Sequence, residues 1–386
     1  MRGTSHSLEV RLARQGLQKL TLRGFKTIRE LTDFEPRPLT VLIGPNGAGK
    51  SNFISFFRLL SWTLAEPGRL QDHIGMLGGA SMILHDGPAK TPVIEAKLGL
   101  STNAGMNEYE FRLAHAAGDT LIYTEERFRF VRAGYTQDTV GWRTLDAGHR
   151  ESRLLPEAGG GGQYAQTAKT ILSLLRKIIV YQFHNTSATA RMRQKWDIDD
   201  GRWLKEDAAN IAPFLYRLRE TDTQCYTRIA ETIRLILPFF ADFELEPEHR
   251  GLLLAWRERD SDRVFNASQA ADGMLRVMAL VTLLLQPESD LPDVLILDEP
   301  ELGLHPFAIN IVGGLIKSTS VKTQVMVATQ STSLVDCYDP EDIVVVEREG
   351  RESKFRRLEG SAYAEWLMEY SLSELWEKNV IGGRPL

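Results

Sequence analysis

The segment that most constrains the fold of this chain reads Gly-Pro-Asn-Gly-Ala-Gly-Lys-Ser and runs from Gly44 to Ser51. It fits the pattern G-x-x-x-x-G-K-[ST] and stands between a β-like run, Leu39–Ile43, and a helix-like run, residues 52–60. Glycines allow a tight turn in which backbone N–H groups converge on phosphate oxygens at the start of a helix. The chain is therefore expected to be an α/β protein that binds a nucleoside triphosphate.

Two residues of this loop have specific expected roles. Lys50 would reach the β- and γ-phosphates, and the hydroxyl group of Ser51 would hold Mg²⁺. The alternative is a glycine-rich turn with a chance lysine, which the flanking strand and helix disfavour. The residues expected to contact the nucleotide are Gly44, Pro45, Asn46, Gly47, Ala48, Gly49, Lys50, Ser51 and Asn52.

A second motif lies far along the chain, where an apolar run from residue 291 ends in Asp298 and Glu299. A continuous apolar run is typical of a parallel strand that is covered on both faces. At the end of such a strand, Asp298 is placed to hold the magnesium of the phosphate site. Glu299 follows as the candidate for polarising an attacking water molecule. An acidic turn after a core strand is the alternative, and the phosphate loop makes it improbable.

Composition excludes several classes of protein. The 386 residues carry a net charge of −5, so any nucleic-acid site must be local. Cys225 and Cys337 form no C-x-x-C pair, which indicates neither a disulfide framework nor a zinc site. The longest apolar run, residues 274–285, is too short to span a bilayer and contains Arg276. We expect a cytoplasmic protein without membrane contact.

Hydrophobic periodicity predicts three consecutive parts. Residues 1–158 would form the first part of the core, with an opening hairpin at 17–31, the phosphate loop and antiparallel strands between 91 and 132. Residues 159–245 begin at four glycines and carry apolar helical faces, which indicates an inserted helical lobe. Residues 246–386 would complete the core with alternating strands and helices.

Four segments together resemble one family. They are Ala271-Asp272-Gly273-Met274-Leu275-Arg276, Arg23-Gly24-Phe25-Lys26, Asp298–Pro306 and Ala328-Thr329-Gln330-Ser331. The first resembles the signature motif of ABC-type P-loop ATPases in the S-D-G-x-x-R form of RecF-like and SMC-like members. The others resemble the opening hairpin, the carboxylate strand with its D-loop, and the switch region. The chain most resembles a stand-alone AAA-type ATPase, similar to the ATPase part of overcoming-lysogenization-type proteins.

The resemblance implies an α/β core with a mixed sheet flanked by helices, an antiparallel β subdomain and an inserted helical lobe. It implies ATP and Mg²⁺ as ligands, and a homodimer in which Asp272 and Gly273 of one copy contact the nucleotide of the other. Catalytic roles fall to Glu299, Lys50 and the switch residue Gln330. Gln182 is the candidate for the glutamine of the Q-loop.

Two departures from the family pattern predict slow turnover. Ala271 replaces the usual serine of the signature, which removes one hydroxyl group from the contact between copies. Gln330 replaces the usual histidine of the switch. A glutamine side chain can orient water or a phosphate oxygen by hydrogen bonding, but it cannot shuttle a proton.

The expected function is an ATP-driven dimer switch that acts on nucleic acid or on a separate nuclease or effector protein, as in bacterial DNA repair or anti-phage defence. Alternatives are the nucleotide-binding subunit of a transporter, and a scaffold without DNA contact. A fused nuclease would need a further Toprim domain, for which residues 332–386 are too few. Asp339, Glu341 and Asp342 fit a solvated turn better than a metal cluster.

A locally basic segment between residues 176 and 205 leaves one question open. It interleaves cations with Tyr181, Trp196 and Trp203, a mixture that nucleic acid binding would use. Asp197, Asp199 and Asp200 interrupt it, and such aromatic residues often pack within a lobe. Packing is the favoured interpretation.

Overall fold

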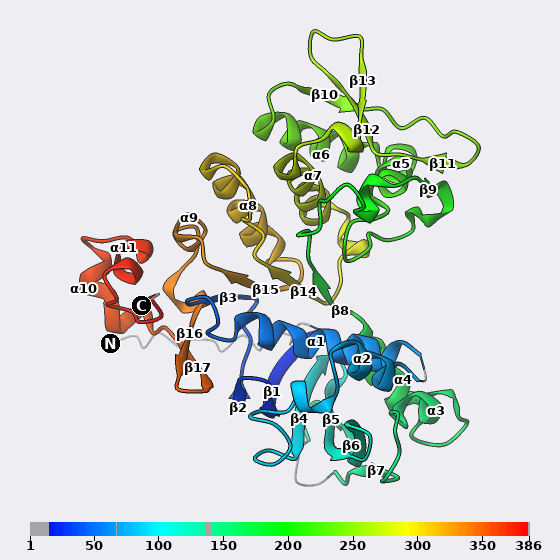
Figure 1. The fold of residues 1–386 in the computed structure, drawn as a ribbon, viewed down its shortest axis with the longest axis vertical. Coiled ribbons are helices and arrows are strands. Elements are labelled where there is room, and N and C mark those ends of the chain that lie inside the picture. Colours follow the sequence, from blue (N-terminus) through cyan, green and yellow to red (C-terminus); the bar gives the residue numbers. More distant parts are fainter. Residues whose placement is uncertain (1–14, 67, 136–139, 385–386) are drawn as a thin grey trace, which may run out of the picture. The chain divides into compact units, whose positions relative to one another are not determined.

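A computed structural model describes residues 15–66, 68–135 and 140–384 (Figure 1). Its contacts group the described chain into two compact units. Unit 1 contains the residues up to Pro36 together with Leu59–Lys177, and unit 2 contains Arg37–Arg58 together with Ile178–Leu386. The units interleave along the chain, whereas the three parts expected from the sequence follow one another; that division stays a prediction.

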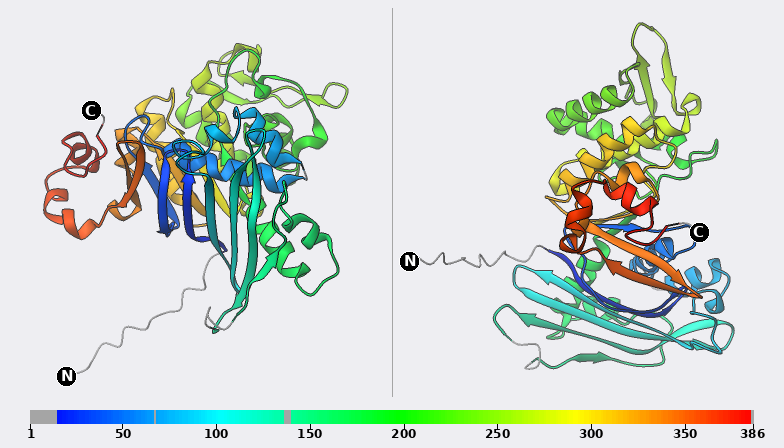
Figure 2. Two further views of the ribbon diagram at one scale, coloured as in Figure 1. Left: turned by 60° about the horizontal axis from the view of Figure 1, so that its bottom comes forward. Right: turned by 90° about the vertical axis from the view of Figure 1, so that its left-hand side faces the viewer.

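Unit 1 is built on a six-stranded antiparallel sheet in the order β2-β1-β4-β5-β6-β7, which bends along its length (Figure 2). Side chains alternate between the two faces because successive residues of a strand point in opposite directions. Its strands are β1 (Gly16–Phe25), β2 (Ile28–Phe34), β4 (Val93–Thr102), β5 (Gly105–Ala116), β6 (Thr120–Arg132) and β7 (Arg143–Leu145). Its helices are α2 (Arg69–Met76), α3 (Leu154–Gly159) and α4 (Ala165–Arg176).

Unit 2 is built on a second six-stranded sheet, in the order β17-β16-β3-β15-β14-β8. The strands from β16 to β8 are parallel, and β17 joins the edge in an antiparallel hairpin. The parallel strands are apolar and buried on both faces, as the continuous apolar runs predict. The strands are β3 (Leu39–Ile43), β8 (Ile178–Tyr181), β14 (Val294–Asp298), β15 (Gln324–Thr329), β16 (Ile343–Glu349) and β17 (Glu352–Arg357).

Helices and two small antiparallel sheets complete unit 2 (Figure 1). Helix α1 (Lys50–Ala65) begins in unit 2 and ends in unit 1. The other helices are α5 (Ile211–Thr221), α6 (Thr223–Ile236), α7 (Asp272–Leu285), α8 (Pro306–Thr319), α9 (Thr332–Val335), α10 (Ala364–Leu367) and α11 (Leu372–Glu377). The small sheets contain β9 (Trp196–Asp197) with β11 (Gly251–Leu252), and β10 (Phe240–Phe243) with β12 (Ala255–Glu258) and β13 (Val264–Asn266).

The fold agrees with the sequence in its main elements. The opening hairpin is β1–β2, the alternating segments are the antiparallel strands β4 to β6, and the carboxylate strand is β14. The stretch expected to be a helical lobe is helical only in part. Its residues 178–181 form β8, because this run of apolar residues completes the parallel sheet beside β14. No described helix is long and apolar enough to cross a membrane.

The buried carboxylate of Glu126 is a structural centre of unit 1. Glu126 has no exposed surface, and its Oε1 accepts hydrogen bonds from the hydroxyl groups of Tyr109 at 2.6 Å and Ser152 at 2.5 Å. The backbone N–H of Arg153 donates to Oε2 at 2.8 Å. A buried carboxylate persists only where such donors replace its hydration. Glu126 therefore ties the start of α3 to strands β5 and β6.

Removing this carboxylate should destabilise unit 1. Glu126→Ala leaves two hydroxyl groups and one N–H without their acceptor, so we expect the free energy of unfolding to fall by about 3 kcal/mol or more. Glu30→Ala, the same change at an exposed ion pair with Arg23, should cost less than about 1 kcal/mol. Urea unfolding followed by circular dichroism measures both. Equal losses in the two variants would contradict the role given to Glu126.

Candidate functional site

The expected site residues of unit 2 converge because four parallel strands end at the same edge of the sheet. Strand register pairs Ile43 with Thr329 and Asp298 with Ala328, and it pairs Leu297 with Tyr181. The segments that follow β3, β15, β14 and β8 therefore leave the sheet side by side. Ligands of open α/β sheets bind at this carboxyl edge. The edge brings together the phosphate loop, the carboxylates, the switch and the segment after β8.

The phosphate loop is held in a shape that only glycine allows at its first position. Gly44 has φ +151°, and a Cβ atom there would lie 2.1 Å from the carbonyl oxygen of Val346. The hydroxyl group of Ser353 on β17 donates to the carbonyl oxygen of Ala48 at 2.5 Å. Helix α1 begins at Lys50, directly after the loop. The sequence therefore places a helix N-terminus behind a fixed turn.

Lys50 is folded back over its own loop. Its Nζ donates to the carbonyl oxygens of Gly44 at 2.6 Å and Pro45 at 3.1 Å, and the residue is 4% exposed. Burial lowers the pKa of Lys50, while the carboxylates of Glu299, Asp298 and Glu301 act in the opposite direction. The ammonium group is therefore within electrostatic range of the three acidic side chains of the carboxylate strand and the loop after it.

Asp298 ends β14 in a nearly buried position. Burial raises its pKa, which the positive charge of Arg58 opposes. Gln182 donates to Asp298 Oδ2 at 3.3 Å, and its own Oε1 accepts from Arg58 at 2.5 Å, which fixes the orientation of the amide. The amide N–H₂ then donates to Nδ1 of His184 at 2.7 Å, so Nε2 of His184 carries the proton and donates to the Asp298 carbonyl oxygen at 2.9 Å.

The remaining oxygen of Asp298 fits a magnesium ion. Oδ1 is buried and has no hydrogen-bond partner among the described residues. A buried carboxylate oxygen without a donor is costly, and a hard cation satisfies it. The hydroxyl group of Ser51, in the first turn of α1, is exposed and can supply a second oxygen. The described residues contain no cluster of three or more His, Cys, Asp or Glu side chains arranged as a metal site, at residues 339–342 or elsewhere.

Glu299 and Gln330 are in direct contact. The side-chain amide of Gln330 donates to Glu299 Oε1 at 2.5 Å. Glu299 has φ +46°, an unfavourable value for a residue with a side chain, and its N–H donates to the carbonyl oxygen of Ala328 at 2.8 Å. Glu301 holds the other side of the switch, because its Oε1 accepts from Thr329 Oγ1 at 2.6 Å and from the N–H of Gln330 at 2.9 Å.

The signature segment forms the start of α7. Asp272 is the first residue of the helix, and Ala271 precedes it without a side-chain hydrogen bond to cap the helix. A Cβ atom on Gly273 would lie 2.8 Å from the carbonyl oxygen of Gly303, so the helix start packs closely against the D-loop. In this single chain, Asp272 and Gly273 are not among the groups that the phosphate loop contacts; the resemblance assigns them to the nucleotide of a second copy.

Two arginines connect the signature to the segment that carries Gln182 and His184. Arg193, whose side chain is 8% exposed, donates to the carbonyl oxygens of Thr186, Ala267 and Ala270 and forms an ion pair with Asp272 at 3.1 Å. Its guanidinium group thus joins the segment after β8 to the residues that lead into the signature and to Asp272.

Arg276, one turn into α7, makes the second connection. It donates to the carbonyl oxygens of Phe183 at 3.2 Å, His184 at 3.1 Å and Leu302 at 3.0 Å. The three acceptors lie in the segment after β8 and in the D-loop. Asp298 contacts Gln182 and His184, and Arg276 contacts the same segment and the D-loop. A displacement of Gln182 and His184 at the site would therefore reach the signature and the D-loop through direct contacts.

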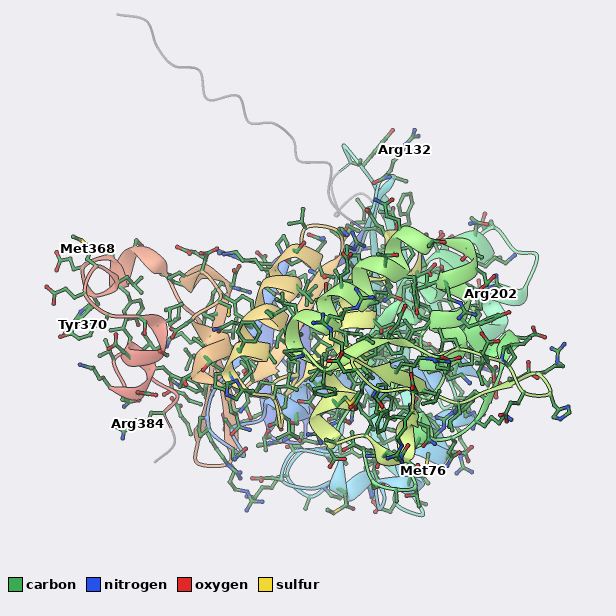
Figure 3. All side chains as sticks on the ribbon, turned by 90° about the horizontal axis from the view of Figure 1, so that it is seen from above. Met76, Arg132, Arg202, Met368, Tyr370 and Arg384 are labelled. Atoms are coloured by element: carbon green, nitrogen blue, oxygen red, sulfur yellow. The ribbon has the colours of Figure 1, made fainter. Side chains whose placement is uncertain are left out.

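Sequence reasoning missed several of these residues. Arg276 and Glu301 lie within the quoted signature and D-loop segments, so their motif positions were a signal, whereas nothing local marks Arg58. Arg193 had been placed in the basic segment, where nucleic acid contact was the alternative. In the structure Arg191 pairs with Asp207 at 3.0 Å and Lys195 with Glu248 at 2.9 Å, and the cations of Arg191 and Lys205 both lie over the ring of Trp196. These contacts favour the packing interpretation. Arg202, labelled in Figure 3, is exposed and lies over the ring of the exposed Trp203.

Comparison with known proteins agrees with this geometry. The family profile described as "AAA domain, putative AbiEii toxin, Type IV TA system" matches residues 39–336. No curated protein matches the chain significantly.

Two solved structures share the fold. One is an SMC head bound to the C-terminal winged-helix domain of ScpA, with 15% identity, a TM-score of 0.58 and coverage of 91% of this chain and 99% of that chain. The other is an Smc head domain with an extended coiled coil bound to the C-terminal domain of ScpA from Pyrococcus furiosus, with 16% identity, a TM-score of 0.54 and coverage of 92% and 99%. At such low identity the likeness establishes the fold alone.

The connections of Arg193 lead to a testable expectation. Arg193→Ala leaves three carbonyl oxygens and the Asp272 carboxylate without their shared donor, so residues 267–272 should open more often. We expect amide hydrogen exchange there to become about tenfold faster or more. Arg191→Ala, which removes an exposed ion pair two residues away, should leave exchange in this segment unchanged. Unaltered exchange in Arg193→Ala would contradict the assignment.

Proposed function

Because the chain belongs to this AAA-domain family and has the fold of an ABC/SMC-like P-loop ATPase, we propose that it binds and slowly hydrolyses ATP. In this proposal, ATP binding drives a head-to-tail dimer whose assembly and release regulate a partner. One observation carries the proposal: the phosphate loop, the half-satisfied Asp298 and the Glu299–Gln330 pair meet at one edge of the sheet.

Nucleotide binding would begin with Lys50. Its ammonium group exchanges the carbonyl oxygens of Gly44 and Pro45 for β- and γ-phosphate oxygens, which carry full negative charge. The N–H groups at the start of α1 complete the cradle. Bound magnesium would neutralise phosphate charge between Asp298 Oδ1 and the hydroxyl group of Ser51.

Hydrolysis would use Glu299 as the group that orients the attacking water and accepts its proton. Gln330, which already donates to Glu299, is placed to hold the same water or a γ-phosphate oxygen. An amide cannot accept and release a proton as histidine does, so turnover should be slow. Glu301 keeps the switch in position by accepting from Thr329 and from the N–H of Gln330.

Dimerisation would complete the phosphate site. The γ-phosphate is neutralised only when donors from both copies surround it. Gly273 and the uncapped start of α7 offer backbone N–H groups for this contact, although Ala271 supplies no hydroxyl group. Arg193 and Arg276 then provide direct contacts from the nucleotide site of one copy to the signature that it presents to the other.

The partner in this proposal is a separate nuclease or effector protein, or nucleic acid, in a repair or anti-phage defence role. The family description, which names a toxin and a toxin–antitoxin system, is consistent with a defence setting. ATP hydrolysis measured with and without single-stranded and duplex DNA separates the two kinds of partner. Stimulation by DNA favours direct contact, and its absence favours an effector protein.

Loss of Lys50 should abolish nucleotide binding. Lys50→Ala removes the only cation that the described phosphate loop places on the β- and γ-phosphates, so affinity for a fluorescent ATP analogue should fall by about a hundredfold or more. Lys354→Ala, at an exposed lysine of β17, is the matched control and should bind normally. Unchanged affinity in Lys50→Ala would mean that the loop is not the site.

The Glu299→Gln variant tests the switch. It should bind ATP normally and hydrolyse it about two or more orders of magnitude more slowly, within the range for loss of a general base. Because γ-phosphate stays intact, the variant should accumulate as an ATP-dependent dimer in light scattering. Ala271→Ser should strengthen that dimer by restoring a donor. A variant that stays monomeric at high concentration, or that dimerises without nucleotide, would refute the ATP-gated dimer.

A further inference from the structure

The segment of residues 359–370, which contains α10, lies on the surface of unit 2, and none of its residues is buried. Helix α11 follows it directly and differs, because Leu372, Leu375 and Trp376 are buried. The two short helices lie together near strands β16 and β17 (Figure 1). Helix α11 therefore anchors this part of the chain, and α10 remains exposed on it.

The exposed segment has an inner and an outer side. Tyr363, Leu367 and Tyr370 are partly buried and pack against the core of unit 2. Trp366 is 48% exposed and Met368 is 86% exposed (Figure 3). One exposed apolar residue is ordinary, but tryptophan and methionine are enriched where proteins meet. The outer side therefore carries side chains that suit a protein interface.

Helical spacing places two carboxylates beside the exposed tryptophan. The N–H of Tyr370 donates to the carbonyl oxygen of Trp366 at 2.9 Å, so the helical turn continues beyond α10. Residues four apart in such a turn lie side by side. The ring centres of Trp366 and Tyr370 are accordingly 6.0 Å apart. The same spacing brings Glu365 next to Glu369, in the row adjacent to the two rings.

The chain supplies a cation to one of these rings but not to the two carboxylates. The Nζ atom of Lys378 lies 4.2 Å from the ring centre of Tyr370. Residues 359–370 contain neither lysine nor arginine. Among the described residues, no cation pairs with Glu365 or Glu369, whose like charges oppose each other within one turn. An indole face beside two such carboxylates attracts a cation from another molecule.

The charge of this surface distinguishes between possible occupants. Its carboxylates repel the phosphate groups of nucleic acid. A second copy related by a twofold axis would bring the same carboxylates against one another. A basic segment that also carries apolar side chains complements both the charge and the exposed apolar residues.

We propose that Glu365, Trp366, Met368 and Glu369 form a docking surface for a basic amphipathic segment of a partner protein; we call them the α10 surface. An arginine of that segment lies over the Trp366 ring and donates to the carboxylates, while an apolar side chain covers Met368. Arginine suits this place because its planar guanidinium group can stack on a ring and donate hydrogen bonds at the same time. This inference rests on the proposed function, in which an effector protein receives the ATP-driven change, and it specifies the chemistry of that contact.

Fluorescence anisotropy with a labelled peptide tests the proposal on the full chain. The probe carries arginine and leucine at helical spacing, and a matched peptide has citrulline, a neutral isostere, in place of every arginine. We expect the arginine peptide to bind about tenfold or more tightly than the citrulline peptide, and its binding to weaken as salt is raised. Trp366→Ala, which removes the aromatic anchor, should lower the affinity by about tenfold or more.

The carboxylates are tested with a charge-matched control. The double variant Glu365→Gln, Glu369→Gln should bind the arginine peptide more weakly and with less dependence on salt. The double variant Glu220→Gln, Glu231→Gln makes the same change of net charge at exposed positions of α5 and α6 and should bind normally.

A second control addresses the aromatic anchor. Trp203→Ala removes a tryptophan that is 59% exposed elsewhere in unit 2, and it should also bind the peptide normally. Because no residue of α10 is buried, its variants should fold and bind ATP as the unchanged chain does.

The outcomes separate this inference from the proposed function, because peptide binding is measured without nucleotide. Equal affinity for the two peptides, or an equal loss in the control variants, would overturn the inference and leave the ATP-gated dimer standing. Self-association without ATP that is lost in Trp366→Ala would also overturn it, since a second copy would then be the occupant. If the Glu299→Gln protein does not dimerise with ATP, the proposed function fails, whereas Trp366-dependent binding of the arginine peptide would still support the α10 surface.

Discussion

The parallel pairing of β14 with β15, and of β15 with β3, is the constraint on which the site depends. This register places Asp298 beside Ala328 and Ile43 beside Thr329, so a carboxylate, a switch residue and a phosphate loop leave the sheet together. The three segments are far apart in the sequence, so interactions between neighbouring residues of the chain cannot position them relative to one another. Parallel strands buried on both faces hold this edge in place, so the loops that leave it can carry strain. The positive φ of Glu299 is held in this way.

The polar groups around that edge form one connected system. Arg58 fixes the amide of Gln182, Gln182 fixes the tautomer of His184, and both contact Asp298. From the same segment, carbonyl oxygens reach Arg276 and Arg193, which hold the D-loop and the signature. Guanidinium groups suit this task because several donors in a fixed plane can join separate pieces of backbone. The nucleotide site and the signature are thereby physically coupled within a single copy.

The two departures from the family pattern have different consequences in the structure. Gln330 retains a place in the site, since it contacts Glu299 directly and is held by Glu301. Its cost is chemical, because an amide does not transfer protons. Ala271 loses a polar contact but borders an apolar pocket, where a methyl group is compatible with its surroundings. The proposed function predicts that the first change slows turnover, whereas the second leaves a methyl group beside an apolar surface.

The sequence by itself determined the local chemistry of this protein. The loop at Gly44–Ser51, the apolar strand ending at Asp298 and Glu299, and the alternating strands of unit 1 are each encoded by residues close together in the chain. Tertiary structure decided what depends on residues far apart. It placed the apolar run Ile178–Tyr181 in the core sheet, and it turned Arg193 from a member of a basic segment into a buried support of the signature. It also brought the end of α6, the start of α7 and the D-loop together around an apolar pocket. Periodicity reports only which face of an element is buried, whereas the partners of a long side chain are set by the register of strands that the sequence pattern does not specify.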